Sequence, residues 1–220
     1  MRDAHRPENE KTVRHLEQTM RTHVAQLSTE TGLPEPAVDV VPFLKGRTPR
    51  INAHFSKPEG VPTITITERA VQELPRRVLR FLLAHEFGHA ANWGFRDKGP
   101  RRFVTVLLLA AVACVLGAIL WITDIGHSIA GLLMLWAGVA TLFGSLWVFP
   151  AFCRVDEYRA DAFAARLTGD LAAARGYFGA LGQDRPKGSL GPWSSHPPVP
   201  DRLAAVEKIL DRKTAQGSAQ

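Results

Sequence analysis

Two histidines and a glutamate in the run HEFGH could together activate a water molecule on a bound metal. His85 and His89 are four residues apart, so in a helix both imidazoles lie on one face and can reach one ion. Glu86 lies one step around the helix, where its carboxylate could act as general base toward that water. The flanking residues are mostly apolar and predict a buried helix. Histidines that are merely hydrogen-bonded inside a buried helix would give the same pattern.

A catalytic zinc site needs a third protein ligand and leaves one position open for water. The segment DEYRADAFAA offers Glu157 and Asp161, again four residues apart. Glu157 could supply the carboxylate ligand, and Asp161 could accept a hydrogen bond from the outer nitrogen of a ligand histidine. A solvated acidic face paired with Arg154 and Arg159 is the alternative. The presence of HEFGH favours the ligand role.

The elements that must position these residues follow from periodicity and capping signals. Helices are predicted over residues 11–31, 68–74, 76–93, 155–167, 171–181 and 201–212. Strands are predicted over 38–41, 51–55 and 63–67, with a turn at 46–49 and a loop at 183–200. Thr67 is placed to cap the second helix, and Gly94 is placed to end the third.

Two apolar segments without a charged residue, Phe103–Thr123 and Ile129–Cys153, separate the two candidate halves of the site. Each exceeds the roughly 20 residues that cross a bilayer core as a helix. They predict a transmembrane helical hairpin, since a core of this size could not surround both helices. A buried hairpin in a water-soluble protein is the alternative. Small residues could let the helices approach closely: Ala110, Cys114, Gly117, Ala140 and Gly144.

Cationic residues flank the hairpin at both outer ends, and the connection at 124–128 has one acidic group. These cations are Lys98, Arg101, Arg102, Arg154 and Arg159. The positive-inside rule therefore places both flanks in the cytoplasm and returns the second half of the site to the side of the first. The first residues contain no apolar stretch, so we expect no cleavable signal peptide.

The overall composition adds little beyond this. The net charge of +6 suits an anionic membrane surface or nucleic acid, but no nucleic-acid-binding motif is visible, so no nucleic acid partner is expected. Cys114 and Cys153 lie in the apolar segments and make no disulfide framework. We interpret them as small apolar residues.

Together these motifs resemble the HtpX-like family of membrane-anchored zinc endopeptidases, which are gluzincins. Members carry HExxH, a downstream ExxxAD-type helix and a later HPxxxxR element. Here these are 85–89, then Glu157 with Asp161, then His196-Pro197 through Arg202. The likeness covers roughly residues 38–210. It departs in one respect, because family members usually carry apolar spans before the catalytic domain as well.

The resemblance implies roles that the residue patterns leave undecided. His196 is similar to a family histidine that stabilises the oxyanion, and Arg202 to an arginine that supports the site by pairing with acidic groups. Asn52 and Ala53, in the stretch INAHF, resemble an edge strand along which the substrate backbone lies. Without the resemblance, these are a loop histidine, a helix residue and a turn.

We therefore expect an α+β fold, in which a mainly helical zincin-type domain with a small edge-strand sheet is interrupted by the hairpin. The expected parts are residues 1–100, 101–153 and 154–213, with a disordered tail at 214–220. One Zn²⁺ per chain would be held by His85, His89 and Glu157. The expected function is hydrolysis of misfolded or membrane proteins at the cytoplasmic face. A non-catalytic zinc scaffold and a zinc hydrolase of lipid-linked substrates remain alternatives.

Overall fold

The computed structural model describes residues 6–42, 50–123, 129–184 and 196–217. The chain divides into two compact units. The first unit contains the chain up to Asn92, residues 157–187 and the chain from Pro198 onward. The hairpin unit contains residues 93–156 and 188–197. The predicted turn at 46–49, the connection at 124–128 and most of the predicted loop at 183–200 lie outside the described residues.

A three-stranded sheet forms one side of the first unit, with the strand order β1-β3-β2. The strands are β1 (Ala37–Val41), β2 (Ala53–Ser56) and β3 (Thr63–Thr67). β3 pairs in parallel with β1 and antiparallel with β2, with Phe55 opposite Ile64. β2 is therefore an edge strand, as the sequence predicts for the stretch that begins at Ala53.

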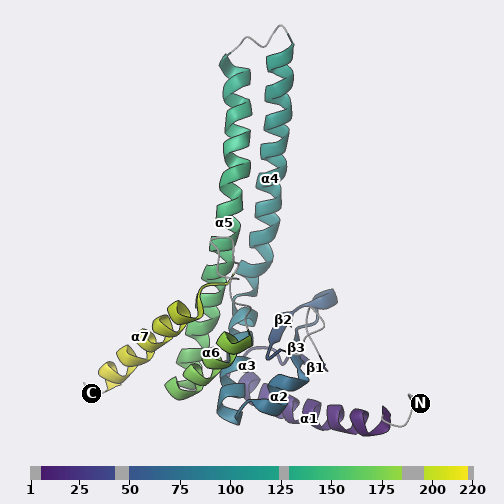
Figure 1. Ribbon diagram of the computed structural model, residues 1–220, viewed down its shortest axis with the longest axis vertical. Helices are drawn as coiled ribbons and strands as arrows, with labels where there is room; N and C mark the ends of the chain where they lie inside the picture. The colour runs from purple at the N-terminus through teal and green to yellow at the C-terminus, as the bar shows by residue number, and fades with distance from the viewer. Residues whose placement is uncertain (1–5, 43–49, 124–128, 185–195, 218–220) are drawn as a thin grey trace. The chain divides into compact units, whose positions relative to one another are not determined.

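Helices α1 (Arg6–Thr31), α2 (Glu68–Glu73) and α3 (Arg76–Ala91) complete the N-terminal part of this unit (Figure 1). Met20, Val24 and Leu27 lie on one face of α1 and are fully buried. The Thr67 side chain accepts a hydrogen bond from the amide of Ala70, which confirms the predicted cap of α2. α3 packs on β2 and on α6, so it lies in the centre of the unit.

The remaining helices of the first unit are the C-terminal part of α5 (Ile129–Thr168), α6 (Leu171–Asp184) and α7 (Val199–Gly217). α5 ends at Gly169, whose φ of +62° is readily adopted only by glycine. α7 continues through Gly217, so the residues predicted to begin a disordered tail are partly helical. Good helix formers such as Lys213 and Ala215 extend it.

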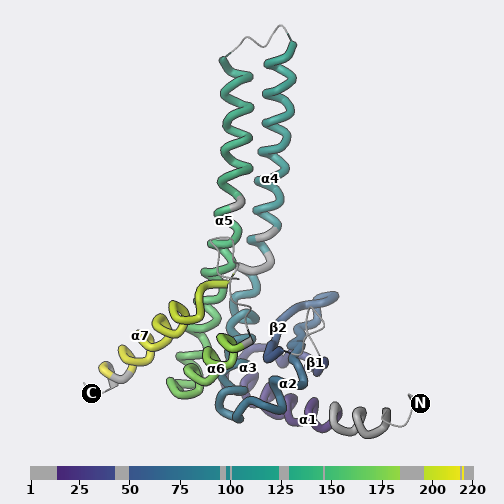
Figure 2. The backbone as a smooth tube through the Cα atoms, in the orientation of Figure 1, coloured from purple at the N-terminus to yellow at the C-terminus, as the bar shows by residue number. Residues whose placement is uncertain are grey.

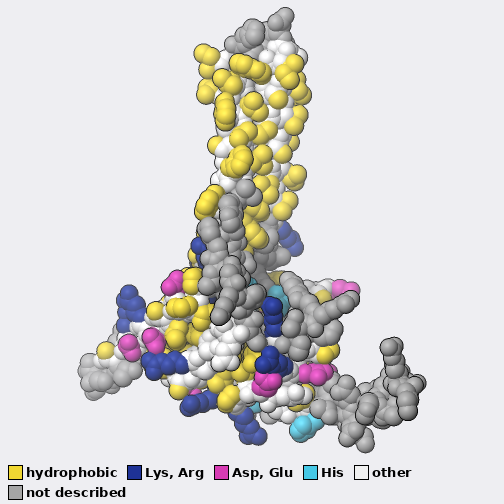
Figure 3. Space-filling view, in the orientation of Figure 1, with side chains coloured by type: hydrophobic (Ala, Val, Ile, Leu, Met, Phe, Trp, Pro, Cys, Tyr) yellow, Lys and Arg dark blue, Asp and Glu magenta, His cyan; other side chains and the backbone are white. Residues whose placement is uncertain are grey.

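The hairpin unit consists mainly of α4 (Trp93–Ile122) and the first part of α5, which run side by side (Figure 2). Both are long and apolar enough to span a membrane, with mean hydropathies of 2.9 and 1.9. Only 11% of the first apolar window and 12% of the second are buried, which argues against core helices of a water-soluble protein. Apolar side chains cover the described surface of the hairpin, whereas charged side chains gather on the first unit (Figure 3).

Two further predicted helix boundaries were wrong. α3 ends at Ala91, and the side chain of its C-cap Asn92 donates to the carbonyl of Gly88. α4 then begins at Trp93 and runs through Gly94, which was predicted to end α3. α5 continues from the apolar span through Glu157, although a separate helix was expected from Val155. No glycine or proline interrupts residues 151–168, so the helix has no cause to end there.

Candidate metal centre

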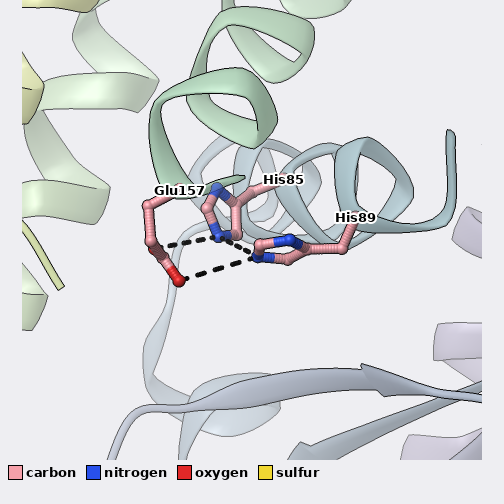
Figure 4. Close-up of side chains that lie close together, drawn as sticks. All are labelled: His85, His89 and Glu157. Carbon is pink, nitrogen blue, oxygen red and sulfur yellow. Dashed lines mark hydrogen bonds and ion pairs between the residues drawn. The ribbon is translucent and has the colours of Figure 1, made fainter. Parts of the chain in front are cut away.

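Three side chains from two helices point toward one another in the first unit (Figure 4). His85 and His89 come from α3, and Glu157 comes from α5. The two Nε2 atoms are 3.2 Å apart. The Glu157 carboxylate oxygens lie 3.7 Å from Nε2 of His85 and 3.8 Å from Nε2 of His89. All three residues are buried.

These separations match a tetrahedral metal site. Zinc binds nitrogen and oxygen ligands at about 2.0–2.2 Å, so two ligands of a tetrahedral ion are roughly 3.3–3.5 Å apart. The three measured separations lie close to that range. Two imidazoles and one carboxylate are also the donor set of zinc hydrolases, and they leave a fourth position for water. Among the described residues, His85, His89 and Glu157 are the group of three or more metal-binding side chains close enough to hold one ion.

Asp161 determines which nitrogen of His85 faces the metal position. Its Oδ1 lies 2.9 Å from Nδ1 of His85. A carboxylate at that distance favours the proton on Nδ1, which leaves Nε2 with its lone pair directed at the other ligands. The structure thus brings Asp161 to the outer nitrogen of a ligand histidine, as its spacing from Glu157 suggested.

Arg202, from α7, pairs with both acidic residues. Its Nε and Nη2 each donate to Asp161 at 2.7 Å, and its Nη1 lies 2.9 Å from Oε2 of Glu157. Arg202 is 1% exposed, so these pairs are shielded from water. The family resemblance implied only pairing with acidic groups in general. The simultaneous contact with Glu157 and Asp161 depends on tertiary packing, so no local pattern could have predicted it.

The charges of this network stabilise one another. Burial alone would raise the pKa of Asp161, but hydrogen bonds from Arg202 and His85 outweigh it and lower that pKa. Burial likewise works against the charge of Arg202, yet the hydrogen bond to Asp161 and the nearby Glu157 raise the pKa of the guanidinium. Both groups therefore stay ionised near neutral pH.

Glu86 is held by the edge strand. Its Oε2 accepts a hydrogen bond of 2.7 Å from the backbone amide of Phe55 in β2. Backbone polar groups alternate sides along an antiparallel strand, so Ala53 and Phe55 share the side away from β3. The outward edge of β2 and the carboxylate of Glu86 are thus neighbours. Sequence reasoning missed this contact because a backbone amide leaves no mark in a side-chain motif.

Gly88 lets the two ligand-bearing helices approach. A Cβ at this position would lie 2.7 Å from Cα and 2.9 Å from the carbonyl oxygen of Ala160 in α5. Ala160 lies between Glu157 and Asp161, so this backbone contact sets their distance from α3.

Tyr177 of α6 packs against the His85 ring at 5.8 Å between centroids, and burial raises the pKa of its hydroxyl. The sequence analysis predicted the helix that carries Tyr177 but not this contact.

Asn52 and His196, the remaining predicted site residues, are both exposed. The backbone carbonyl of Asn52 accepts from the amide of Thr67, while its residue surface is exposed just before β2. His196 is exposed and belongs to the hairpin unit. Its role near the scissile bond stays a prediction. Cys114 and Cys153 are partly buried, and they do not form a disulfide with each other.

Comparisons with known proteins agree on one family. The model for peptidase family M48 matches residues 14–210. A protease HtpX homologue of Methanopyrus kandleri is 27% identical over 214 residues, covering 84% of this chain and 65% of its own length. An HtpX homologue of Chlorobium phaeobacteroides is 28% identical over 211 residues, covering 84% and 69%. The chain thus spans about two thirds of the length of these relatives.

A solved structure shows the same fold. The crystal structure of Ste24p from S. mikatae superposes with a TM-score of 0.58 at 18% identity. The match covers 86% of this chain and 50% of the other. The predicted arrangement of a mainly helical domain with a small sheet and two long apolar helices is thereby confirmed at the level of the fold.

Proposed function

The chain belongs to peptidase family M48, and from that premise we propose that it is a membrane-anchored, zinc-dependent endopeptidase. The observation that carries the proposal is the near-tetrahedral spacing of His85, His89 and Glu157 beside Glu86. A zinc site that only stabilises the fold has no use for Glu86. A carboxylate that follows His85 directly on the same buried helix does have a use in hydrolysis, as the base for a metal-bound water.

Zinc bound at this position would polarise a water molecule and the scissile carbonyl, which lowers the pKa of that water toward neutrality. Glu86 takes the proton of the attacking water and passes it to the leaving amine. The Phe55 amide holds the Glu86 carboxylate in place for both transfers. Asp161 keeps the His85 lone pair directed inward, and Arg202 fixes both Asp161 and Glu157.

The substrate is an extended polypeptide in this proposal. The outward edge of β2 at Ala53 offers backbone groups to which an extended chain can add as a further strand, next to the Phe55 amide that holds Glu86. Such pairing reads backbone rather than side chains, which suits a protease with broad sequence preference. Asn52 borders this edge, and His196 would stabilise the oxyanion. Misfolded or membrane proteins are the substrate class that a membrane-anchored site would meet.

Replacing Glu86 by glutamine tests this mechanism. Glutamine keeps the shape and the acceptor for the Phe55 amide but cannot take a proton. We expect cleavage of an unfolded protein in detergent to fall by about 10²–10⁴-fold, while zinc stays stoichiometric. Glu73→Gln, which removes an exposed carboxylate on α2, should change neither quantity.

The metal arm of the same experiment uses Glu157→Ala, which should lose zinc as well as activity. Full cleavage by Glu86→Gln would refute the general-base role. The native chain could also bind zinc, leave the protein substrate intact and hydrolyse a lipid-linked substrate. That result would instead favour a hydrolase of lipid-linked substrates. Zinc binding with no hydrolysis of either substrate would favour a scaffold.

The proposal includes a cytoplasmic first unit, which the cations that flank the two spans favour. Arg77 is exposed in the first turn of α3, about two helical turns before His85. In a chain with both native cysteines replaced by alanine, Arg77→Cys should react with a membrane-impermeant maleimide only after the cells are opened. Labelling of intact cells would reverse the proposed orientation.

A further inference from the structure

The glycines of the hairpin differ in what surrounds them. A Cβ at Gly117 would lie 2.5 Å from the backbone nitrogen of Leu135, and one at Gly138 would lie 2.6 Å from the sulfur of Cys114. These glycines let α4 and α5 touch. A Cβ at Gly144 would meet nothing within 4 Å. The sequence predicted Gly144 as a contact residue, but it faces open space instead.

That space belongs to a groove between α4 and α5 with a volume of about 590 Å³. Gly144 lines it, together with Phe103 and Phe149, whose rings pack at 4.9 Å between centroids. Phe152 also lines it and lies directly over Gly99, where a Cβ would overlap the ring. The groove is largely apolar, and its volume falls in the range of small-molecule sites.

Two cations, Lys98 and Arg102, line the groove where α4 leaves the apolar span. They are four residues apart, so they lie on one face of the helix. Both are exposed, and within the described parts of the chain neither makes an ion pair. In the first unit, by contrast, Arg69, Arg80 and Arg175 each face a glutamate.

We propose that this groove binds one anionic phospholipid, with an acyl chain against Gly144 and the aromatic rings and the phosphate between Lys98 and Arg102. Cations at the headgroup end of an apolar groove between membrane helices match the two ends of such a lipid. A polypeptide fits less well. The walls are helices whose backbone groups are already paired, so an extended segment would find no partner for its own.

The test is lipid binding by the full chain in detergent, measured by native mass spectrometry with added phosphatidylglycerol or phosphatidylcholine. All variants carry Glu86→Gln, so the result does not depend on proteolysis. We expect one phosphatidylglycerol per chain to bind in preference to phosphatidylcholine. Removing both cations in Lys98→Gln/Arg102→Gln should weaken phosphatidylglycerol binding about 30-fold.

The matched control is Arg77→Gln/Arg101→Gln, which removes two positive charges as well. Arg101 is next to Arg102 in the sequence but does not line the groove. It should bind the lipid as the parent does. Gly144→Leu fills the open space without removing a charge, so it should abolish retention of either lipid at this site. Zinc content, measured in parallel, shows that the first unit of each variant is folded.

The proposal is overturned if both double variants lose binding equally, because net charge alone would then explain it. It is also overturned if Gly144→Leu binds phosphatidylglycerol as well as the parent does. The proposal is also contradicted if an apolar transmembrane peptide displaces the lipid and binds to Lys98→Gln/Arg102→Gln as well as to the parent. That result would assign the groove to a polypeptide segment.

Discussion

The two units of this chain distribute polar and apolar groups in opposite ways. The first unit buries charge, since Asp161 and Arg202 are each 1% exposed at its centre. The hairpin exposes apolar side chains, since Leu108 is 62% and Leu109 65% exposed. The buried charges of the first unit are tolerated because Asp161 and Arg202 pair with each other. The exposed apolar side chains of the hairpin are tolerated where lipid, and not water, surrounds them.

This contrast shows where each unit is vulnerable. In the first unit, stability depends on pairing, so the loss of one partner leaves another charge buried and alone. In the hairpin, helix association depends on close packing, because lipid is as apolar as the side chains. The same kind of substitution should therefore have different consequences in the two regions.

The largest effect is expected from Arg202→Met. This change leaves Asp161 and Glu157 buried without their cation, so it should destabilise the metal-free first unit by about 3–5 kcal/mol. Thermal unfolding of the full chain in detergent with a chelator measures it. Zinc should partly restore the midpoint, since the ion would neutralise Glu157.

The matched control is Arg175→Met, which breaks an exposed pair of Arg175 in α6 with Glu207 in α7. Arg175 is 60% exposed at its side chain, so its loss should cost no more than about 1 kcal/mol. Equal midpoints for the two variants would contradict the view that burial makes the Arg202 network essential.

A second prediction applies one substitution, glycine to alanine, to both units. Gly88→Ala should push α5 away from α3 and destabilise by about 1–3 kcal/mol, because its Cβ meets the Ala160 backbone. The shift separates Glu157 from the histidines, so zinc affinity should fall. Gly138→Ala creates a similar overlap with Cys114 but should leave zinc affinity unchanged.

The controls are Gly179→Ala and Gly144→Ala, where the added methyl group meets open space. Both should be neutral or slightly stabilising, since alanine favours a helix. Zinc affinity is measured by competition with a chelating dye, and stability by thermal unfolding. A loss of zinc affinity in Gly138→Ala would mean that the two units are coupled more closely than this comparison assumes.

The contrast also explains how much the sequence could reveal about the site. His85, His89, Glu157 and Asp161 were predictable because helical spacing of four places each pair on one face. The Phe55 amide and the contact of Arg202 with Glu157 were not, because they join segments that are far apart in sequence. The sequence contains the charged residues Arg202, Glu157 and Asp161, but it does not show that they pair with one another.

The fold was predictable to a similar degree. Strands β1 to β3 and the two apolar helices follow from alternation and from length. The continuity of α5 was not predictable. Its side chains change from apolar to polar near Val155, but this change alters what surrounds the helix and does not interrupt its backbone. For the same reason, Gly144 could not be distinguished from Gly138 by composition alone.

The smallest effect concerns a partly exposed histidine of the first unit. Burial and the nearby positive charges of Arg76 and Arg80 lower the pKa of His23 below 6.5. Above pH 6.5, His23 is neutral in both the folded and the unfolded chain and contributes no pH dependence. As the pH falls below 6.5, the unfolded chain takes up the proton more readily, so stability is lost.

His23→Gln should therefore lose less stability than the parent between pH 7.5 and pH 5.5, in thermal unfolding of the metal-free chain. The control is His15→Gln, which removes an exposed histidine from the same helix and should follow the parent. Each variant keeps every titrating group except the one that it replaces, so comparing each with the parent separates the effect of His23 from that of His15. An identical pH response of the two variants would contradict a lowered pKa of His23 in the folded chain.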